Sequence, residues 1–367
     1  MDNPSKYSYM NITFFIGGLS GGGAERVTCN MANYMNDKGH HVEILTMADD
    51  EPSYPLSRGI VRKALLQDSE RKNFAYNSIL RFVRFIKYLR ATKAEAVVVM
   101  LPVTTIMLLW TRQWLRGKVI AAERSLPTVY SNKEQRLLKR VAHKADGWVF
   151  QTKEQQEWYK DSNINRGVII PNAINPIFIK PVYEGDRNKH IVTVGSLTKP
   201  KNHELLIESF ARISDEFPEY KLVIYGTGSK LETLQSFAKE YSVIDKVVFP
   251  GYTKHVDRVI ADASLFVLSS DYEGMPNALM EAMALGLPCI STDCDGGGAR
   301  FLIENEKNGL IVPKGDSNAL AEAMRRMLSD DAFAVNCGME AHKICERFAP
   351  DKVYGCWEKY ITEIINN

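Results

Sequence analysis

The organisation of this chain follows from the residues Asp271-Tyr272-Glu273-Gly274-Met275-Pro276-Asn277-Ala278-Leu279-Met280-Glu281. They come after the apolar run Ala263 to Leu268, which is short and bounded by turn-forming residues, as a buried parallel strand should be. Gly274 and Pro276 predict a tight turn with the proline near the first position of a helix, and Gly286 predicts where that helix ends. The sequence therefore predicts a strand, a loop and a helix in succession.

The first turn of the predicted helix offers backbone N–H groups, those of Asn277 to Met280, that have no partner inside the helix. In an α/β sheet such groups point into the crevice at the carboxyl end of the strand, where they can bind an anion. Glu273 on the loop and Glu281 in the helix bracket this position, and carboxylates suit the hydroxyl groups of a sugar better than an anionic group. The alternative interpretation is one solvated turn residue and one exposed helix residue.

The same residues resemble the Glu-x7-Glu signature of retaining glycosyltransferases with the GT-B fold, and more narrowly that of glycosyltransferase family 4. The resemblance implies an α/β protein with two Rossmann-like domains that face each other across a cleft. It also implies that Glu273 contacts the donor sugar beside the reacting carbon and that Glu281 contacts the nucleotide ribose. The segment between them would hold the diphosphate, and it comprises Gly274, Met275, Pro276, Asn277, Ala278 and Leu279.

Length and composition are those of a two-domain globular protein, with 367 residues, 45% hydrophobic and 25% charged. The net charge of +2 hides an asymmetry, because residues 58–144 contain 19 Lys and Arg but five Asp and Glu. The six cysteines form no Cys-x-x-Cys pair and no histidines stand at zinc-ligand spacing, so we expect reduced thiols and no metal site. We expect no signal peptide, and no apolar run approaches the roughly twenty residues of a spanning helix. These patterns predict a cytoplasmic protein.

The N-terminal part begins with a β-α-β pattern that has a glycine-rich first turn. The expected strand 11–16 leads into the loop 17–23, which opens the next helix. The dinucleotide-binding fingerprint is a rival interpretation, but Arg26 stands where its third glycine belongs. Gly22 and Gly23 resemble the N-domain loop that faces the donor phosphates and the acceptor in the family, so we predict that both contribute to donor binding.

A charged pair, Glu123-Arg124, follows the expected strand 119–122 at the sheet edge where α/β proteins place their sites. Arg124 can hold a donor phosphate or an anionic acceptor with its planar guanidinium, and we predict a catalytic role for it. Family members often have a histidine in this neighbourhood, and this chain has none there. A structural ion pair is the alternative.

The second half repeats the order of strand, glycine turn and helix, beginning with the expected strand 190–195. The family's motif here has an arginine directly after the glycine and a lysine six positions beyond it, and both clamp the diphosphate. The lysine is present as Lys201, whereas Ser196 replaces the arginine. The resemblance therefore assigns catalysis and donor binding to Lys201 and places Ser196 in the donor site. Lys199 and Arg124 are two candidates to substitute for the missing arginine.

Two further segments complete the predicted site and the domain organisation. The loop at Gly251-Tyr252 reaches the nucleotide base in the family, and Asn172 belongs to a run that resembles the hinge between the family's domains. We place the linker at 176–188, where the sequence is polar and contains proline. We therefore predict an acceptor-binding domain over 1–175, joined by a C-terminal helix over 350–367 that crosses back to it, and a nucleotide-sugar-binding domain over 176–349.

Residues 77–93 interleave apolar and basic side chains at roughly helical spacing. An amphipathic helix with a basic polar face can lie on an anionic membrane surface, so we interpret 77–144 as a candidate membrane-binding segment. A packed surface helix with a solvated basic face is the alternative. We expect no nucleic-acid partner, because no recognised nucleic-acid motif accompanies the charge.

Together these features imply a retaining hexosyltransferase that moves a sugar from a nucleotide-sugar, with a UDP-sugar favoured, to a lipid-linked or polysaccharide acceptor in cell-surface glycan synthesis. Departure of a nucleotide diphosphate needs positive or dipolar stabilisation, which Lys201 and the helix N-terminus would supply. The nucleotide-sugar is a substrate, and we expect no cofactor. We expect a cytoplasmic location, with a peripheral position on the inner face of the cell membrane as a second expectation. The alternatives are another GT-B enzyme, an epimerase or phosphorylase, and a non-catalytic peripheral membrane-binding protein.

Overall fold

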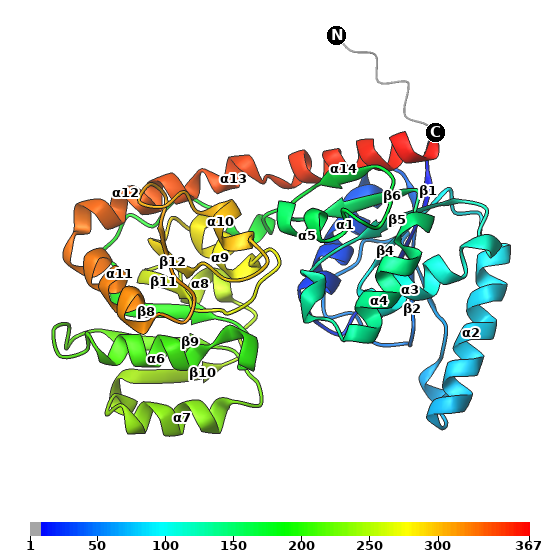
Figure 1. The fold of residues 1–367 in the computed structure, drawn as a ribbon. Helices are drawn as coiled ribbons and strands as arrows, with labels where there is room; N and C mark the ends of the chain where they lie inside the picture. Colours follow the sequence, from blue (N-terminus) through cyan, green and yellow to red (C-terminus); the bar gives the residue numbers. More distant parts are fainter. Residues whose placement is uncertain (1–8) are drawn as a thin grey trace, which may run out of the picture. The chain divides into compact units, whose positions relative to one another are not determined.

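The computed structural model describes residues 9–367, and the chain divides into two units (Figure 1). The N-terminal unit extends to Pro171 and also includes Asp351–Asn367, whereas the C-terminal unit is Asn172–Pro350. The boundary thus falls slightly before the predicted one at residue 175, and the segment 176–188 lies inside the C-terminal unit.

The N-terminal unit is built on a parallel sheet of seven strands within residues 9–171, in the order β3-β2-β1-β4-β5-β6-β7. The strands are β1 (Asn11–Ile16), β2 (His41–Thr46), β3 (Val61–Ala64), β4 (Ala96–Met100), β5 (Lys118–Ala122), β6 (Gly147–Phe150) and β7 (Gly167–Ile169). The helices are α1 (Gly23–Asp37), α2 (Phe74–Ala91), α3 (Pro102–Trp110), α4 (Asn132–Val141), α5 (Lys153–Trp158) and α14 (Pro350–Ile365). β4 is buried along its whole length, as expected of a central parallel strand whose two faces are both covered.

The C-terminal helix α14 packs on the N-terminal unit, as predicted. Its side chains Trp357, Ile361 and Ile364 are buried. The backbone N–H of Trp148 donates to the Tyr360 hydroxyl oxygen over 3.0 Å. A side chain at Gly147 would collide with that tyrosine, since its Cβ would lie 2.4 Å from the hydroxyl oxygen. The close approach of α14 therefore depends on a glycine in β6.

The C-terminal unit has a parallel sheet of six strands, in the order β10-β9-β8-β11-β12-β13. The strands are β8 (Asn188–Val194), β9 (Lys221–Tyr225), β10 (Val247–Gly251), β11 (Ala263–Leu268), β12 (Cys289–Thr292) and β13 (Leu310–Val312). The helices are α6 (His203–Ala211), α7 (Leu231–Glu240), α8 (Val256–Val259), α9 (Asn277–Ala284), α10 (Gly298–Leu302), α11 (Ser317–Ser329), α12 (Asp331–His342) and α13 (Ile344–Arg347). The predicted fold class of two Rossmann-like α/β domains is confirmed.

The strand order of the C-terminal unit reverses between β8 and β11. The chain leaves β8 towards β9 and β10 on one side, and it returns to β11 on the other side. In sheets of this kind the loops that follow the two strands at the reversal diverge and leave a crevice at their carboxyl ends. The loop after β8 carries Lys201, and the loop after β11 carries Glu273.

Two features differ from the expectations. The edge strand β3 was not expected, because its short sequence includes Arg62 and Lys63, which carry no apolar alternation. The run that contains Asn172 follows β7, whose regular pairing ends at Ile169, although the sequence 167–175 predicts one continuous strand. Among residues 9–367, no helix has both the length and the apolar character needed to cross a membrane.

Candidate functional site

Lys201 and Glu273 meet at the carboxyl edge of the C-terminal sheet. The Lys201 Nζ lies 2.5 Å from Oε1 of Glu273, which is buried. The hydroxyl of Ser270 donates to the same oxygen over 2.8 Å. Both bonds end on Oε1, so the protein fixes this carboxylate through one of its two oxygens.

Hydrogen bonds tie the two loops together. The Asp271 N–H donates to the carbonyl oxygen of Pro200 over 2.9 Å, and the Asn202 side-chain amide donates to the Asp271 carboxylate over 2.8 Å. The Ser269 hydroxyl donates to the Lys201 carbonyl oxygen over 3.0 Å. These contacts involve Lys201, the residues on either side of it, and two residues that precede Glu273, so they fix the two loops beside the ion pair.

A third loop packs against the backbone of Glu273 and Gly274. The Glu273 N–H donates to the Asp295 carbonyl oxygen over 3.0 Å. A Cβ at Gly296 would lie 1.8 Å from the Glu273 carbonyl oxygen, and a Cβ at Gly298 would lie 1.9 Å from that of Gly274. Glycine is therefore required at both positions for this loop to support the loop that carries Glu273.

Helix α9 begins directly after this loop, with Pro276 as its N-cap. The Met280 N–H donates to the Pro276 carbonyl oxygen over 3.1 Å, so the prediction that included Met280 among the groups without an intrahelical partner was wrong. The first turn instead presents the N–H groups of Asn277, Ala278 and Leu279. The residues that precede it, Gly274, Met275 and Pro276, are buried.

The structure also brings Asn172 and Glu281 into the C-terminal unit. The Asn172 side-chain amide donates to the Asn277 side-chain oxygen over 2.8 Å, which links the predicted hinge residue to the first residue of α9. Glu281 is buried inside α9, one helical turn beyond Asn277. Asn172 therefore contacts the first residue of α9, and Glu281 lies one turn further along the same helix.

Ser196, Gly251 and Tyr252 lie on other loops of the same edge. Ser196 is exposed, and its hydroxyl shares a hydrogen bond of 3.0 Å with that of Thr198. Gly251 ends β10 in the left-handed region, with φ +84°, and Tyr252 is exposed. The Gly226 N–H donates to the Gly251 carbonyl oxygen over 2.9 Å, which connects the loops after β9 and β10.

Two neutral groups accompany the Lys201–Glu273 pair. His203 is buried at the start of α6, and burial together with the charge of Lys201 lowers its pKa to about 4. Burial and then the charge of Glu273 raise the pKa of the Cys294 thiol to about 12. Both side chains are uncharged near neutral pH, so they leave the balance of charge to the lysine and the glutamate. The sequence analysis did not identify His203, Cys294 or Ser270 as site residues. Nothing in the local sequence around these residues indicates that they lie close to Lys201 or Glu273.

Arg124, Gly22 and Gly23 belong to the N-terminal unit. Gly22 is the N-cap of α1 and Gly23 is its first residue, so the glycine loop leads into a helix N-terminus as predicted from its sequence. Arg124 is buried, and burial lowers its pKa to about 10. Its N–H donates to the carboxylate of Glu123 over 3.1 Å.

Glu123 holds the loop that carries Arg124. Its Oε1 accepts from the Tyr130 hydroxyl over 2.5 Å, and its Oε2 accepts from the Tyr159 hydroxyl over 2.7 Å. Burial raises the pKa of this carboxyl, and the tyrosine and backbone hydrogen bonds oppose that rise. Glu123 thus orders this loop from inside the unit.

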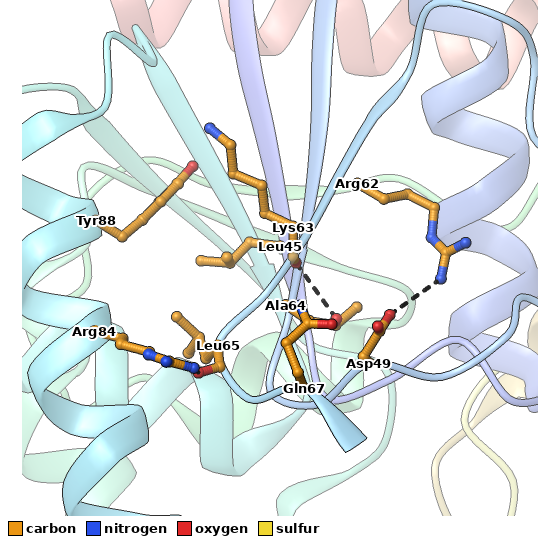
Figure 2. Close-up of a pocket in the computed structure, with 10 residues that line it drawn as sticks. Leu45, Asp49, Arg62, Lys63, Ala64, Leu65, Gln67, Arg84 and Tyr88 are labelled. Atoms are coloured by element: carbon orange, nitrogen blue, oxygen red, sulfur yellow. Dashed lines mark hydrogen bonds and ion pairs between the residues drawn. The ribbon is translucent and has the colours of Figure 1, made fainter. Parts of the chain in front are cut away.

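A cavity of about 500 Å³ lies at the carboxyl ends of β2 and β3, where α2 covers them (Figure 2). Its charged side chains are engaged within the unit. Arg84 forms a two-pronged ion pair with Glu70, with both N–O distances 2.6 Å, and the Lys63 Nζ lies 2.6 Å from the Glu43 carboxylate. The cavity therefore presents a mixed polar lining. The lining residues are Leu45, Thr46, Asp49, Arg62, Lys63, Ala64, Leu65, Gln67, Arg84 and Tyr88.

Comparison with known families agrees with this arrangement. Residues 21–177 match the family described as Glycosyltransferase Family 4, and residues 177–344 match the family described as Glycosyl transferases group 1. The chain belongs to glycosyltransferase family 4. It is accordingly a glycosyltransferase of the GT-B type.

Individual relatives and solved structures have low sequence identity to this chain or match only part of it. A Campylobacter jejuni protein, GalNAc-alpha-(1->4)-GalNAc-alpha-(1->3)-diNAcBac-PP-undecaprenol alpha-1,4-N-acetyl-D-galactosaminyltransferase, is 26% identical over 97% of this chain and 99% of its own length. An exopolysaccharide phosphotransferase of Streptomyces coelicolor is 32% identical over 60% of this chain, which spans 24% of that relative. The crystal structure of Anabaena Alr3699/HepE in complex with UDP and glucose has a TM-score of 0.82 at 16% identity, and it covers 96% of this chain and 100% of its own. That likeness concerns the fold.

Proposed function

We propose that this glycosyltransferase transfers a hexosyl group with retention, from a nucleotide-sugar to a lipid-linked or polysaccharide acceptor in cell-surface glycan synthesis. The observation that carries the proposal is the Lys201–Glu273 ion pair beside the N-terminus of α9. The cation and the helix N-terminus suit the diphosphate of a nucleotide-sugar, and the carboxylate beside them suits its sugar.

The proposed chemistry divides these roles. The departing nucleotide diphosphate develops negative charge, which the Lys201 ammonium and the first-turn N–H groups of α9 stabilise. Glu273 positions the donor sugar and stabilises the positive charge that develops at its anomeric carbon. Retention means that the acceptor oxygen bonds to that carbon on the face from which the diphosphate leaves, as the bond between sugar and diphosphate breaks and the proton of the acceptor hydroxyl passes to the departing diphosphate oxygen. Glu281 would contact the ribose.

The remaining predicted residues complete the donor site in this proposal. Gly251 and Tyr252 would contact the base and Ser196 would lie beside the diphosphate, while Gly22 and Gly23 would approach the donor phosphates. Arg124 would hold a phosphate of the donor or an anionic acceptor. We propose that the reaction needs no metal ion, so that a chelator leaves its rate unchanged.

A UDP-sugar and a lipid-linked acceptor are our preferred substrates. The name of the Campylobacter relative, which aligns over nearly the full length of both chains, includes a diphospho-undecaprenol acceptor. The solved structure with UDP and glucose gives a reason to place UDP first in a donor panel. A lipid-linked acceptor also implies work at a membrane surface, which we propose as the second partner of the protein.

The experiment is a transfer assay with the purified full chain, a panel of UDP-, GDP- and ADP-sugars, and acceptors that include a lipid extract and free glycans. We expect transfer from a UDP-sugar, with the anomeric configuration of the product equal to that of the donor by NMR. The Glu273→Ala variant is the control for a contaminating activity. Absence of transfer from every donor, or an inverted product, would refute the proposal.

A further inference from the structure

Arg81 and Arg84, in the middle of helix α2, both bind other groups of the N-terminal unit. The Arg81 guanidinium donates to the carbonyl oxygen of Met47 over 3.1 Å, and Arg84 pairs with Glu70. On the same side of the helix, Phe85 and Leu89 are buried. Of the basic residues in 77–93, Arg81 and Arg84 are therefore bound within the unit and do not form a solvated basic face.

The opposite side of α2 exposes large apolar side chains. Ile79 is 67% exposed, Phe82 48% and Val83 57%. Because these residues are three and four positions apart, they share one face of the helix. Phe74, at the first position of α2, is 85% exposed. The helix lies at the edge of the N-terminal unit (Figure 1). The exposure of its apolar residues shows that this face is not covered within the described part of the unit.

The charges that accompany this apolar face are all positive. Phe74–Ala91 contains no Asp or Glu. Lys87 and Arg90 are exposed one and two turns beyond Val83, on the same side of the helix. Pairing two copies of this face about a two-fold axis would bring like charges together. Anionic lipid headgroups above an acyl layer match both the cations and the apolar residues.

We propose that α2 inserts its apolar face, Ile79, Phe82 and Val83, into the interface of an anionic lipid bilayer, with Lys87 and Arg90 on the headgroups. This inference deepens the membrane partner of the proposed function by naming the surface and its orientation. The insertion is mainly apolar, so the binding persists at high salt, whereas binding through a solvated basic face is screened.

The test is co-sedimentation of the full chain with vesicles of phosphatidylglycerol and phosphatidylcholine in equal parts, at low and high salt. The variant I79S/F82S/V83S should bind at least about tenfold more weakly at both salt concentrations. A matched control is V335S/M339S, which removes two exposed apolar side chains from α12 and should bind like the wild type. Thermal unfolding of both variants should match the wild type, because the replaced side chains are exposed.

A second experiment tests the charged residues of this surface. The variant K87Q/R90Q should bind more weakly at low salt and like the wild type at high salt, and vesicles of phosphatidylcholine alone should bind the wild type about as well as the mixed vesicles do at high salt. Failure of the wild type to bind, or equal binding by I79S/F82S/V83S, would overturn the proposal. So would a wild-type dimer that the serine variant converts to a monomer, since a second copy would then cover this face. Transfer to a detergent-solubilised acceptor is measured separately. A failure of the proposed transferase activity can then be told apart from a failure of membrane binding.

Discussion

The Lys201 Nζ lies 2.5 Å from Oε1 of Glu273, and the pair joins the loops that follow the neighbouring strands β8 and β11. In the absence of a donor, the cation and the carboxylate therefore neutralise each other at the sheet edge. In the proposed mechanism, a diphosphate bound at the start of α9 would compete with Glu273 for the lysine. The ion pair would then keep both groups in position until the donor binds.

Replacing Glu273 by alanine should abolish turnover while the nucleotide still binds. Loss of a group that stabilises charge in the transition state costs about 100-fold or more in kcat. Because the change also releases Lys201 from its partner, UDP should bind at least as tightly as to the wild type. Calorimetric titration with UDP and the transfer assay measure the two effects. As a control, Glu304→Ala removes an exposed glutamate and should leave the rate unchanged; a near-normal rate for Glu273→Ala would exclude it from the mechanism.

Replacing Ser270 by alanine should lower kcat and leave KM nearly unchanged. Its hydroxyl donates to the same Glu273 oxygen as Lys201, and the loss of a hydrogen bond to a charged group is worth about 1.5 kcal/mol or roughly tenfold. In the Glu273→Ala background the same change should have no further effect on the residual rate, because the group that Ser270 positions is absent. An equal loss of rate in both backgrounds would show that Ser270 acts on the loop rather than on the carboxylate.

Replacing Gly296 by alanine should destabilise the protein more than replacing Gly315. Both glycines have positive φ, +103° and +76°, so an alanine at either costs about 1–2 kcal/mol in backbone strain. At Gly296 the new Cβ would also meet the Glu273 carbonyl oxygen, whereas at Gly315 nothing lies within 4 Å. We expect an additional loss of at least about 1 kcal/mol and loss of activity for Gly296→Ala alone. Denaturant unfolding and the transfer assay provide the measurements, and equal behaviour of the two variants would contradict the role of the close approach.

The resemblance to the family's motifs placed Lys201 and Glu273 in one predicted donor site, whereas the strand order that brings their loops together came from the structure. Each residue follows an apolar strand, and the loops of strands at a reversal of order share one edge. The glycines and the proline around residues 274–276 likewise marked the start of α9. Glycine and proline restrict the backbone locally, so the start of a helix can be predicted from them without knowing how the side chains pack.

The orientation of α2 could not be predicted in the same way. Its periodicity shows two faces, one richer in arginine, but not which of them meets the sheet. The outcome depends on Glu70, which precedes the helix in a separate short turn and binds Arg84. The edge strand β3, which also lines the cavity beside Arg84, was missed because it lacks apolar alternation. The orientation of α2 and the formation of β3 therefore both depend on contacts between segments that are separate in the sequence.

His203 should make the stability of the protein depend on pH between about 6.5 and about 4. Its pKa is lowered from 6.5 to about 4 by burial and by the charge of Lys201, so the unfolded chain binds a proton in this window that the folded protein excludes. The contribution of His203 to the free energy of unfolding is therefore fully present above pH 6.5 and is lost as the pH falls to about 4. The loss between pH 7 and pH 4.5 is about 2–3 kcal/mol. Carboxylates titrate in the same range, so the informative quantity is the difference between wild type and His203→Leu in the change of unfolding free energy from pH 7 to pH 4.5. The leucine variant should lose that part of the pH dependence, whereas His143→Gln, which removes an exposed histidine, should keep it. If wild type and His203→Leu lose equal stability on acidification, then His203 is not held neutral beside Lys201.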